Sequence, residues 1–342
     1  MKLTGKKIFV GLSGGVDSAV SAALLVSQGA NVTGVFIKGW YPPGMPCTWA
    51  ADRRDAMRVA AHLGIPFVTL DASREYKKGV IDYLLAEYRA GRTPNPDVMC
   101  NREVKFGAFF AYAKLHGAHF IATGHYARSE DGVLLRGVDR AKDQSYFLWA
   151  VSADALAQTL FPVGGMQKDA VRMYARAHHL PVATKKDSQG ICFLGSISVE
   201  DFLRAEYGSH LGEAVDEAGA LVGTHEGALL YTIGERVPLP QGPWYVRRKD
   251  VARNVIVVSN ERLVSGGMTT RFALTDVVWH AAETGTVSCD AEYRYHGPRV
   301  AGVYDTASAT FTPTGPLAEA VSGGQSLVLY SRERVLGGGI IR

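Results

Sequence analysis

Apolar runs alternate with helix-like segments over the first third of the chain. Short β-like runs such as KIFVGL (7–12), NVTGVFIK (31–38) and IPFVTLD (65–71) are each followed by a segment whose apolar residues recur at helical spacing. This alternation predicts a parallel sheet with helices on both faces, that is, a doubly wound α/β domain. Several helical segments end in glycine, as expected for left-handed C-caps: Gly29, Gly64, Gly91 and Gly117.

The pattern changes after residue 197. A short helical run, VEDFLRAEYG (199–208), leads into short pieces rich in turn residues, and from 268 onward alternating runs are typical of the strands of a small barrel or sandwich. We therefore predict three domains. They are an α/β domain over 1–197, a small connecting domain over 198–267 and an all-β domain over 268–342.

Composition narrows the class of protein without identifying it. With 342 residues, 47% of them hydrophobic, the chain is long enough for two or three cores. No uninterrupted apolar run reaches the roughly 18 residues that a membrane span needs, so we expect no membrane partner. The formal net charge of +4 permits a polyanionic partner but does not require one. The four cysteines form no CxxC pair, which argues against a zinc or iron–sulfur site and favours the reducing cytoplasm.

The stretch LSGGVDS (12–18) lies between the first β-like run and the first helical run. Gly14 and Gly15 allow backbone N–H groups to approach an anion, and Asp17 or Ser18 begins the helix whose positive end faces it. The stretch has no lysine, so it is not a Walker A loop, and it does not match the GxGxxG dinucleotide pattern. It resembles instead the PP-loop of the ATP pyrophosphatases, which cleave ATP between the α and β phosphates and leave an adenylated substrate.

Two further stretches combine a cysteine with charged residues. In RTPNPDVMCNREVKF (92–106), Asp97 precedes Cys100 by three residues and nearby basic side chains favour a thiolate. In KKDSQGICF (185–193), two lysines precede Cys192. From spacing alone, these cysteines are as compatible with packing as with a pair of reacting thiols. We interpret the other two cysteines, Cys47 and Cys289, as packing residues.

Taken in order, several motifs resemble the tRNA-specific 2-thiouridylase family, known as MnmA or TrmU, over nearly the whole chain. They are SGGVDS, GRTPNPDVMCNREVKF, ATGHYAR, KDQSYFLW, FPVG, DSQGICF, YTIGERVPLPQGPWYV and GQSLVLYSRERVLGGGII. The resemblance implies a tRNA-uridine 2-sulfurtransferase that thiolates carbon 2 of the wobble uridine (position 34). It also implies an N-terminal domain of the adenine nucleotide alpha hydrolase-like, PP-loop kind, a small central domain and a C-terminal all-β barrel.

The resemblance further implies a mechanism. ATP adenylates the carbonyl oxygen of the uridine, which makes AMP the leaving group. Cys192 carries a persulfide, Cys100 is its nucleophilic partner, and Asp97 matches the general acid/base. The persulfide either attacks carbon 2 directly or is reduced by Cys100 to hydrosulfide, and both routes end in a disulfide between the two cysteines.

The family pattern also implicates binding residues. Those for ATP are Gly11, Leu12, Ser13, Gly14, Gly15, Val16, Asp17, Ser18, Ile37 and Gly124. Those for tRNA are Asn95, Pro96, Asp97, His125, Lys142, Asp143, Gln144, Arg294, Tyr295 and Gln325.

We expect ATP with Mg²⁺ as the activating substrate, persulfide sulfur on Cys192, and no resident metal. The implied partners are tRNAs that read Lys, Glu and Gln codons, and a cysteine desulfurase or sulfur-relay protein as sulfur donor. We expect a cytoplasmic monomer.

Three other interpretations are less consistent with the motifs. Another PP-loop enzyme, which adenylates a carbonyl for amidation, would share SGGVDS but would not need both cysteines. An iron–sulfur tRNA thiolase would need clustered cysteines. A non-catalytic RNA-binding module would need neither the phosphate loop nor the cysteine pair.

Overall fold

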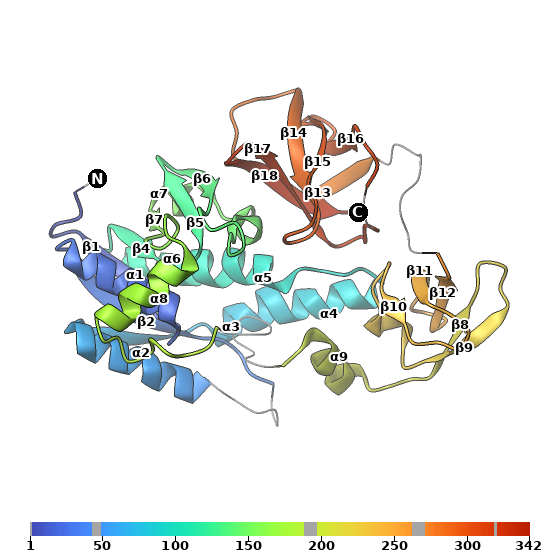
Figure 1. Cartoon of the computed structure of the whole chain (residues 1–342), viewed down its shortest axis with the longest axis horizontal. Helices are drawn as coiled ribbons and strands as arrows, with labels where there is room; N and C mark the ends of the chain where they lie inside the picture. The colour runs from blue at the N-terminus through green and yellow to red at the C-terminus, as the bar shows by residue number, and fades with distance from the viewer. Residues whose placement is uncertain (1, 43–48, 188–196, 262–270, 318–319) are drawn as a thin grey trace.

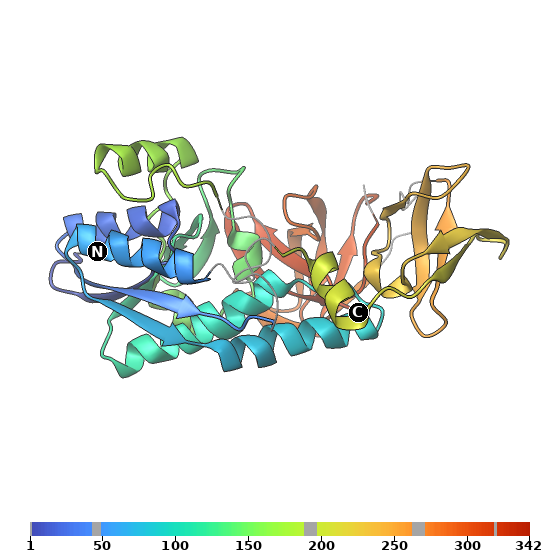
Figure 2. The ribbon, with the colours of Figure 1, turned by 90° about the horizontal axis from the view of Figure 1, so that it is seen from below.

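The computed structural model describes residues 2–42, 49–187, 197–261, 271–317 and 320–342. The molecule is elongated, with an α/β domain at one end, a small β-rich domain at the other and a barrel beside the middle (Figure 1). Seen from below, two long helical rods run from the α/β domain toward the small domain (Figure 2). Among the described residues, no helix is both long and apolar enough to cross a membrane.

A five-stranded parallel sheet in the order β3-β2-β1-β4-β7 organises the first domain. Its strands are β1 (Lys7–Gly11), β2 (Asn31–Lys38), β3 (Phe67–Asp71), β4 (Phe120–Ala122) and β7 (Thr159–Leu160). The chain builds outward from β1 to β3 and then returns to the other side of β1 with β4. The carboxyl ends of β1 and β4 therefore form the point where the strand order reverses, the usual ligand site of such sheets.

Helices cover both faces of this sheet. One apolar cluster joins the sheet to helices α1 (Val16–Ser27), α2 (Trp49–Leu63) and α8 (Lys168–Ala177). A second cluster joins the opposite face to the helical segments between residues 73 and 115. The predicted doubly wound α/β fold is confirmed.

The second face is covered by two rods that each contain a π-helical segment. The first comprises α3 (Ser73–Tyr76), η1 (Lys77–Ile81) and α4 (Asp82–Arg89). The second comprises α5 (Pro96–Met99), η2 (Cys100–Ala108) and α6 (Phe109–Leu115). They touch closely, because a Cβ on Gly79 would lie 2.7 Å from Cγ of Glu103. Since π-helical segments are rare and often mark functional positions, Cys100 at the start of η2 stands out.

The four glycines predicted to end helices do so in the left-handed conformation. Their φ angles are +76° at Gly29, +64° at Gly64, +76° at Gly91 and +74° at Gly117. A side chain would be strained at each of these positions. The first helix begins at Val16, slightly before the predicted Asp17.

The C-terminal strands form a closed antiparallel barrel in the order β13-β16-β15-β14-β17-β18, with β18 pairing back to β13. Their bounds are β13 (Phe272–Trp279), β14 (Thr286–Glu292), β15 (Val300–Asp305), β16 (Thr310–Pro313), β17 (Ser326–Ser331) and β18 (Arg334–Ile341). Of the two predicted alternatives, the barrel is therefore correct. A hairpin from the first domain, β5 (Ala127–Glu130) and β6 (Val133–Arg136), extends this sheet alongside β18.

The barrel shares a core with the α/β domain. Val328, Tyr330 and Val335 lie in the same buried cluster as Tyr146 and Trp149. Tyr146 lies in the 3-10 segment η3 (Ser145–Leu148), Trp149 directly follows that segment, and α7 (Ala153–Ala157) comes shortly after. This shared core holds the barrel in a defined position relative to the parallel sheet.

The small domain is a five-stranded sheet in the order β10-β11-β12-β8-β9. Its elements are α9 (Val199–Tyr207), β8 (Gly212–Val215), β9 (Leu221–His225), η4 (Ala228–Leu230), β10 (Arg236–Val237), β11 (Trp244–Asp250) and β12 (Val255–Ser259). It has its own small core around Val246, Ile256 and Val258.

Candidate active site

The glycine loop joins the end of β1 to the start of α1. Gly14 has φ +78°, and a Cβ there would lie 2.3 Å from the backbone oxygen of Asp52, so this position requires glycine. Ser13 and Ser18 hold the loop, with 3.2 Å between their Oγ atoms. No described side chain caps the helix, so its first N–H groups face the loop as in anion-binding helix termini.

Gly124 lies beside this loop, just after β4. A Cβ at Gly124 would be 2.7 Å from the backbone nitrogen of Ser18 and 2.9 Å from the carbonyl carbon of Asp17. Ile37 is buried near the end of β2, with 8% of its surface exposed. The structure therefore brings the predicted ATP residues to the carboxyl edge of neighbouring strands, around the point where the strand order reverses.

The segment 92–97 leads into the second helical rod. The Oδ1 of Asn95 accepts hydrogen bonds from the N–H groups of Asp97 (3.1 Å) and Val98 (3.3 Å), and Pro96 occupies the first helical position. This cap fixes the start of α5. Asp97, the predicted acid/base, is therefore presented from a rigid helical turn at the entrance to the π-helical segment.

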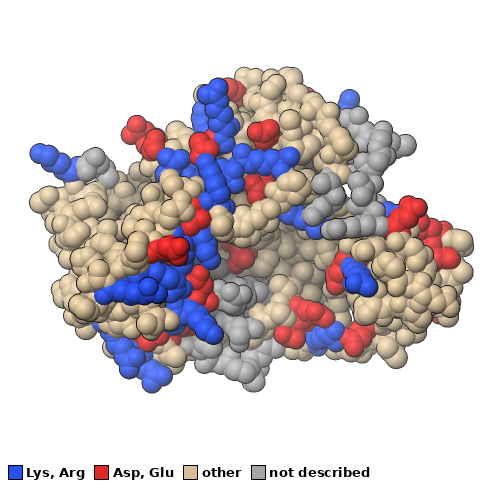
Figure 3. All heavy atoms as spheres, viewed as in Figure 1, with Lys and Arg blue, Asp and Glu red and all other residues tan. Residues whose placement is uncertain are grey.

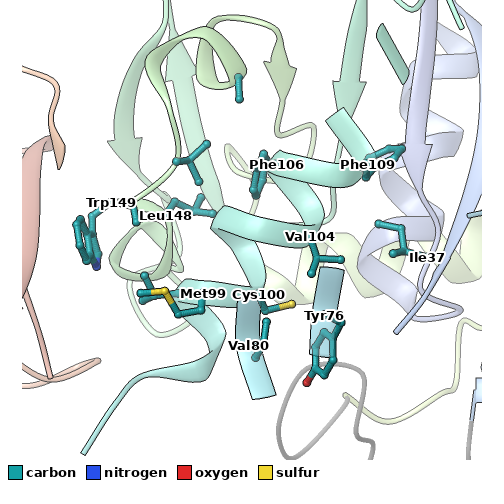
Figure 4. Packing of buried hydrophobic residues seen from close by; sticks show 14 of the residues in the cluster. Ile37, Tyr76, Val80, Met99, Cys100, Val104, Phe106, Phe109, Leu148 and Trp149 are labelled. Carbon is teal, nitrogen blue, oxygen red and sulfur yellow. The ribbon is translucent and has the colours of Figure 1, made fainter. Parts of the chain in front are cut away.

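Cys100 begins η2 and its side chain is buried. None of its surface is exposed, and it lies in the apolar cluster with Val80 and Val104, beside Tyr76 (Figure 4). In this arrangement the thiol is shielded from solvent. Its predicted partner Cys192 lies outside the described residues, as does Cys47.

Cys289 has the character of a packing cysteine. Burial in the barrel raises the pKa of its thiol to about 12. At neutral pH it is therefore protonated and a poor nucleophile.

His125 is buried in the loop that follows β4, next to Lys105 of the second helical rod. Its Nδ1 lies 2.8 Å from Oγ1 of Thr123, and its Nε2 lies 3.4 Å from Nζ of Lys105. Burial, followed by the charge of Lys105, lowers the pKa of His125 well below its usual value. Because an ammonium group only donates, Nε2 accepts and the neutral ring carries its proton on Nδ1.

The predicted tRNA residues 142–144 make contacts within the protein. Lys142 pairs with Asp187 at 3.1 Å, and the Oε1 of Gln144 accepts the N–H of Tyr126. Asp143 is only 3% exposed, and its carboxylate accepts hydrogen bonds from the N–H of Gly137 and from the guanidinium of Arg136. In this structure Asp143 positions the segment.

A cavity of about 190 Å³ opens where the barrel meets the segment that leads into α5. The lining residues come from four separate stretches of sequence: Pro94, Asn95, Tyr146, Tyr293, Arg294, Tyr295, Gln325 and Ser326. Four of the predicted tRNA residues therefore meet at one cavity: Asn95, Arg294, Tyr295 and Gln325.

The cavity has both an aromatic and a polar side. Tyr295 is 38% exposed; its ring stacks on His296 at 3.9 Å and contacts Phe147 at 4.3 Å. The Oε1 of Gln325 is buried and meets no hydrogen-bond donor among the residues that the structure describes. A buried acceptor without a donor is costly unless a ligand supplies one. Stacking rings beside it suit an unpaired nucleobase.

A backbone contact holds the two sides of this cavity together. The N–H of Thr93 donates to the carbonyl of Gly323 at 2.8 Å. Next to it, Gly324 has φ +90°, and a Cβ there would lie 2.9 Å from the nitrogen of Thr93. Glycine at this position therefore lets the barrel approach the segment that contains Asn95.

Sequence reasoning missed three side chains at the phosphate loop. The Nζ of Lys168 lies 2.8 Å from both carboxylate oxygens of Asp17, and the hydroxyl of Tyr126 donates to one of them at 2.7 Å. Asp187 contacts Lys168 at 2.9 Å. Lys168 is the first residue of its helix, where the helix dipole disfavours a cation, and this was the available signal.

Charged side chains gather in a band on one face of the molecule (Figure 3). Figure 3 shows Lys and Arg running in a band from the barrel onto the α/β domain, with Asp and Glu among them. Such a band favours a polyanionic ligand without selecting one. Among the described residues, no three His, Cys, Asp or Glu side chains gather as a metal site would require.

Comparison with protein families gives three consecutive matches. Residues 6–196 match the tRNA methyl transferase HUP domain, 200–260 the tRNA methyl transferase PRC-barrel domain, and 269–341 the aminomethyltransferase beta-barrel domain.

Comparison with individual proteins gives relatives that match nearly from end to end. The chain is 44% identical over 354 residues to a tRNA-specific 2-thiouridylase MnmA of Stenotrophomonas maltophilia (strain K279a), covering 98% of this chain and 93% of that protein. It is 42% identical over 361 residues to the MnmA of Shewanella frigidimarina (strain NCIMB 400), covering 98% and 96%. A 4-thiouridine synthetase solved with RNA and ATP is 20% identical, with a TM-score of 0.36, over 57% of this chain and 46% of that one.

Proposed function

Since the chain belongs to the tRNA-specific 2-thiouridylase family, we propose that it is a tRNA sulfurtransferase that converts the wobble uridine (position 34) to 2-thiouridine. The observation that carries this proposal is the cavity at the barrel, where Asn95, Tyr295 and the unpartnered acceptor of Gln325 meet. An unpaired base would stack on the aromatic side and donate its N–H to the polar side. Base-modifying enzymes that act on a flipped nucleotide need such a cavity.

In the first step, the uridine carbonyl oxygen attacks the α phosphorus of ATP, and pyrophosphate leaves. The glycine loop and the first N–H groups of α1 bind the phosphates, with Gly124 keeping the adjacent strand close. Mg²⁺ arriving with ATP would neutralise phosphate charge. Asp17 is the acidic side chain of the loop itself and would be its protein ligand.

In the second step, sulfur replaces the adenylated oxygen. The terminal sulfur of a Cys192 persulfide attacks carbon 2 and AMP leaves. The Cys100 thiolate then attacks Sγ of Cys192, breaking the sulfur–sulfur bond and forming a disulfide. In the alternative order, Cys100 first releases hydrosulfide, which attacks carbon 2. Both orders leave a disulfide that an external dithiol must reduce before the next turnover, and in both Asp97 acts as acid/base.

The remaining assignments follow the same proposal. We assign catalysis to residues 1–197 and tRNA binding to 198–267 and 268–342, with Asn95, Pro96 and Asp97 at the target base. His125, Lys142, Gln144 and Arg294 would contact or position the tRNA. The substrates are tRNAs reading Lys, Glu and Gln codons, the sulfur source is a cysteine desulfurase or relay protein, and the enzyme acts as a cytoplasmic monomer.

Nucleoside mass spectrometry tests the proposal. Unmodified glutamate tRNA is incubated with the protein, Mg-ATP, a cysteine desulfurase and cysteine, and its nucleosides are analysed. We expect 2-thiouridine, formed only with ATP. Formation of AMP without any thiolated nucleoside, with a relay protein also supplied, would contradict the sulfurtransferase assignment.

Three cysteine variants test the sulfur route. Cys192→Ser and Cys100→Ser should each lose thiolation while keeping tRNA-dependent release of pyrophosphate. Cys289→Ser is the matched control, because Cys289 is also buried but lies in the barrel core, and it should keep thiolation. Thiolation by Cys100→Ser at the rate of the control would contradict the role of Cys100.

A further inference from the structure

The glycine loop has no lysine of its own, yet a lysine lies in contact with it. Lys168, 151 residues after Asp17, places its Nζ 2.8 Å from both oxygens of the Asp17 carboxylate. Only 11% of the Lys168 side chain is exposed. We propose that Lys168 binds the β and γ phosphates of ATP and stabilises the departing pyrophosphate, a role that rests on the proposed function.

Several contacts hold Lys168 in place. Its backbone N–H donates to the Oδ2 of Asp139 at 2.9 Å, which fixes the start of α8. Its ammonium group lies 5.6 Å from the ring centre of Tyr126, whose hydroxyl binds the same Asp17 carboxylate. Lys168 is thus directed at the second residue of α1, where phosphates bound by the helix N-terminus would lie.

The charges around Lys168 form a paired cluster. Asp187 contacts Lys168 at 2.9 Å, Arg172 at 2.6 Å and Lys142 at 3.1 Å. With Asp17, and with Asp139 at the backbone of Lys168, this cluster holds three cations and three carboxylates, so its charges balance. Each lysine and arginine already has a carboxylate partner, so phosphate oxygens would replace or join a carboxylate without leaving any cation unpaired.

The ion pair between Lys168 and Asp17 lies at the phosphate loop, unlike an ion pair that only joins two helices. Lys185, by comparison, also bridges two carboxylates, those of Asp52 (2.8 Å) and Asp55 (2.7 Å), and is 31% exposed. It ties α2 to the segment after α8 through these two carboxylates, whereas Asp17 pairs with Lys168. Lys185 therefore serves as a matched control for the loss of a bridging lysine.

Binding of ATP, pyrophosphate and AMP to the full chain, measured by calorimetry, tests the role of Lys168. Lys168→Met should weaken binding of ATP and of pyrophosphate by about 10- to 100-fold, because hydrogen bonds to charged groups contribute about 1.5–3 kcal/mol. Binding of AMP, which lacks the β and γ phosphates, should change less than about twofold. Lys168→Arg should recover most of the loss, and Lys185→Met should bind ATP as the unchanged protein does.

Two results would overturn the proposal. One is a loss of AMP binding in Lys168→Met as large as its loss of ATP binding. A loss of ATP binding in Lys185→Met as large as that in Lys168→Met counts the same way, because either result indicates a general effect on packing. The other is unchanged ATP binding in Lys168→Met. If Lys168→Met does not fold, Lys168→Gln is measured in the same way. Lys168→Met could lose pyrophosphate binding selectively while the unchanged protein forms no 2-thiouridine. That result would support the role of Lys168 and reject the proposed function.

Discussion

Gly124 packs directly against the backbone of Ser18. A single added carbon at Gly124 would lie 2.7 Å from the Ser18 nitrogen, which is closer than a side-chain carbon normally approaches. Ser18 lies in the first turn of α1, which follows β1, and Gly124 lies in the loop from β4 to β5. Their contact closes the point at which the sheet reverses its strand order. The geometry of the phosphate loop thus depends on a glycine outside it.

Gly124→Ala should therefore impair ATP binding. The added methyl group would displace the loop, and overpacking of this kind costs about 1–3 kcal/mol, so we expect ATP affinity to fall by roughly tenfold or more. Gly315→Ala is the control, because nothing lies within 4 Å of a Cβ at that exposed position. Calorimetric titration with ATP measures both variants, and equal affinities would refute the dependence on Gly124.

Gly324→Ala should weaken tRNA binding and leave ATP binding intact. Its Cβ would meet the Thr93 nitrogen at 2.9 Å and separate the two sides of the cavity. Gly285→Ala matches it in backbone conformation, with φ +79° against +90°, but has nothing within 4 Å. We expect the tRNA dissociation constant to rise about tenfold for Gly324→Ala beyond any change in Gly285→Ala. A filter-binding assay measures both constants. Equal tRNA dissociation constants for Gly324→Ala and Gly285→Ala would show that the contact with Thr93 does not contribute to tRNA binding.

Cys100 should be protected from alkylation in the resting protein. Because none of its surface is exposed, labelling requires local opening, and the rate should be about two orders of magnitude below that in the denatured chain. Peptide mass spectrometry after iodoacetamide treatment measures this rate for Cys100 separately from the other cysteines. Addition of ATP and tRNA to Cys192→Ser should accelerate labelling if Cys100 becomes the nucleophile. Continued protection under these conditions would contradict that role.

The stability of the protein should fall below pH 6.5 in part because of His125. Burial and Lys105 lower its pKa in the folded state, so below the unfolded value of about 6.5 the unfolded chain binds a proton that the folded chain does not. The stabilising contribution is therefore present above that pH and is lost as pH falls.

His125→Gln should remove this contribution. Its free energy of unfolding should depend less steeply on pH, by up to about 1.4 kcal/mol per pH unit below pH 6. His225 and His280 also have lowered pKa values through burial but are common to both proteins, so the difference reports on His125. Urea unfolding between pH 5 and 7.5 provides the comparison. Parallel curves would mean that His125 is protonated in the folded state.

The parts of the site that are local in sequence were predictable, whereas those built by tertiary contacts were not. The glycine loop follows from LSGGVDS alone, because strand, turn and helix are consecutive. The contact of Lys168 with Asp17 spans 151 residues, and nothing in the periodicity of α8 reveals which loop its first residue meets. The burial of Cys100 likewise depends on the packing of two separate helical rods.

The hairpin formed by β5 and β6 was missed although a local signal was present. Asp131 and Gly132 have positive φ angles of 51° and 81°, and an Asp-Gly pair between short alternating runs is a strong hairpin signal. The segment RSEDGVLLR (128–136) is rich in charged and polar residues, so its alternation did not stand out as two strands. That the hairpin extends the barrel sheet could not be read from sequence, because the pairing of Leu135 with Arg334 is set by the shared core.

Isotope tracing tests the central claim of ATP-dependent sulfur transfer most directly. An anticodon stem-loop whose wobble uridine carries ¹⁸O at the carbon 2 carbonyl is incubated with the protein, Mg-ATP and the sulfur-donating system, and the products are analysed by mass spectrometry. The account predicts 2-thiouridine together with AMP that contains one ¹⁸O atom, because the carbonyl oxygen leaves on the α phosphorus. Thiolated product accompanied by unlabelled AMP would contradict it.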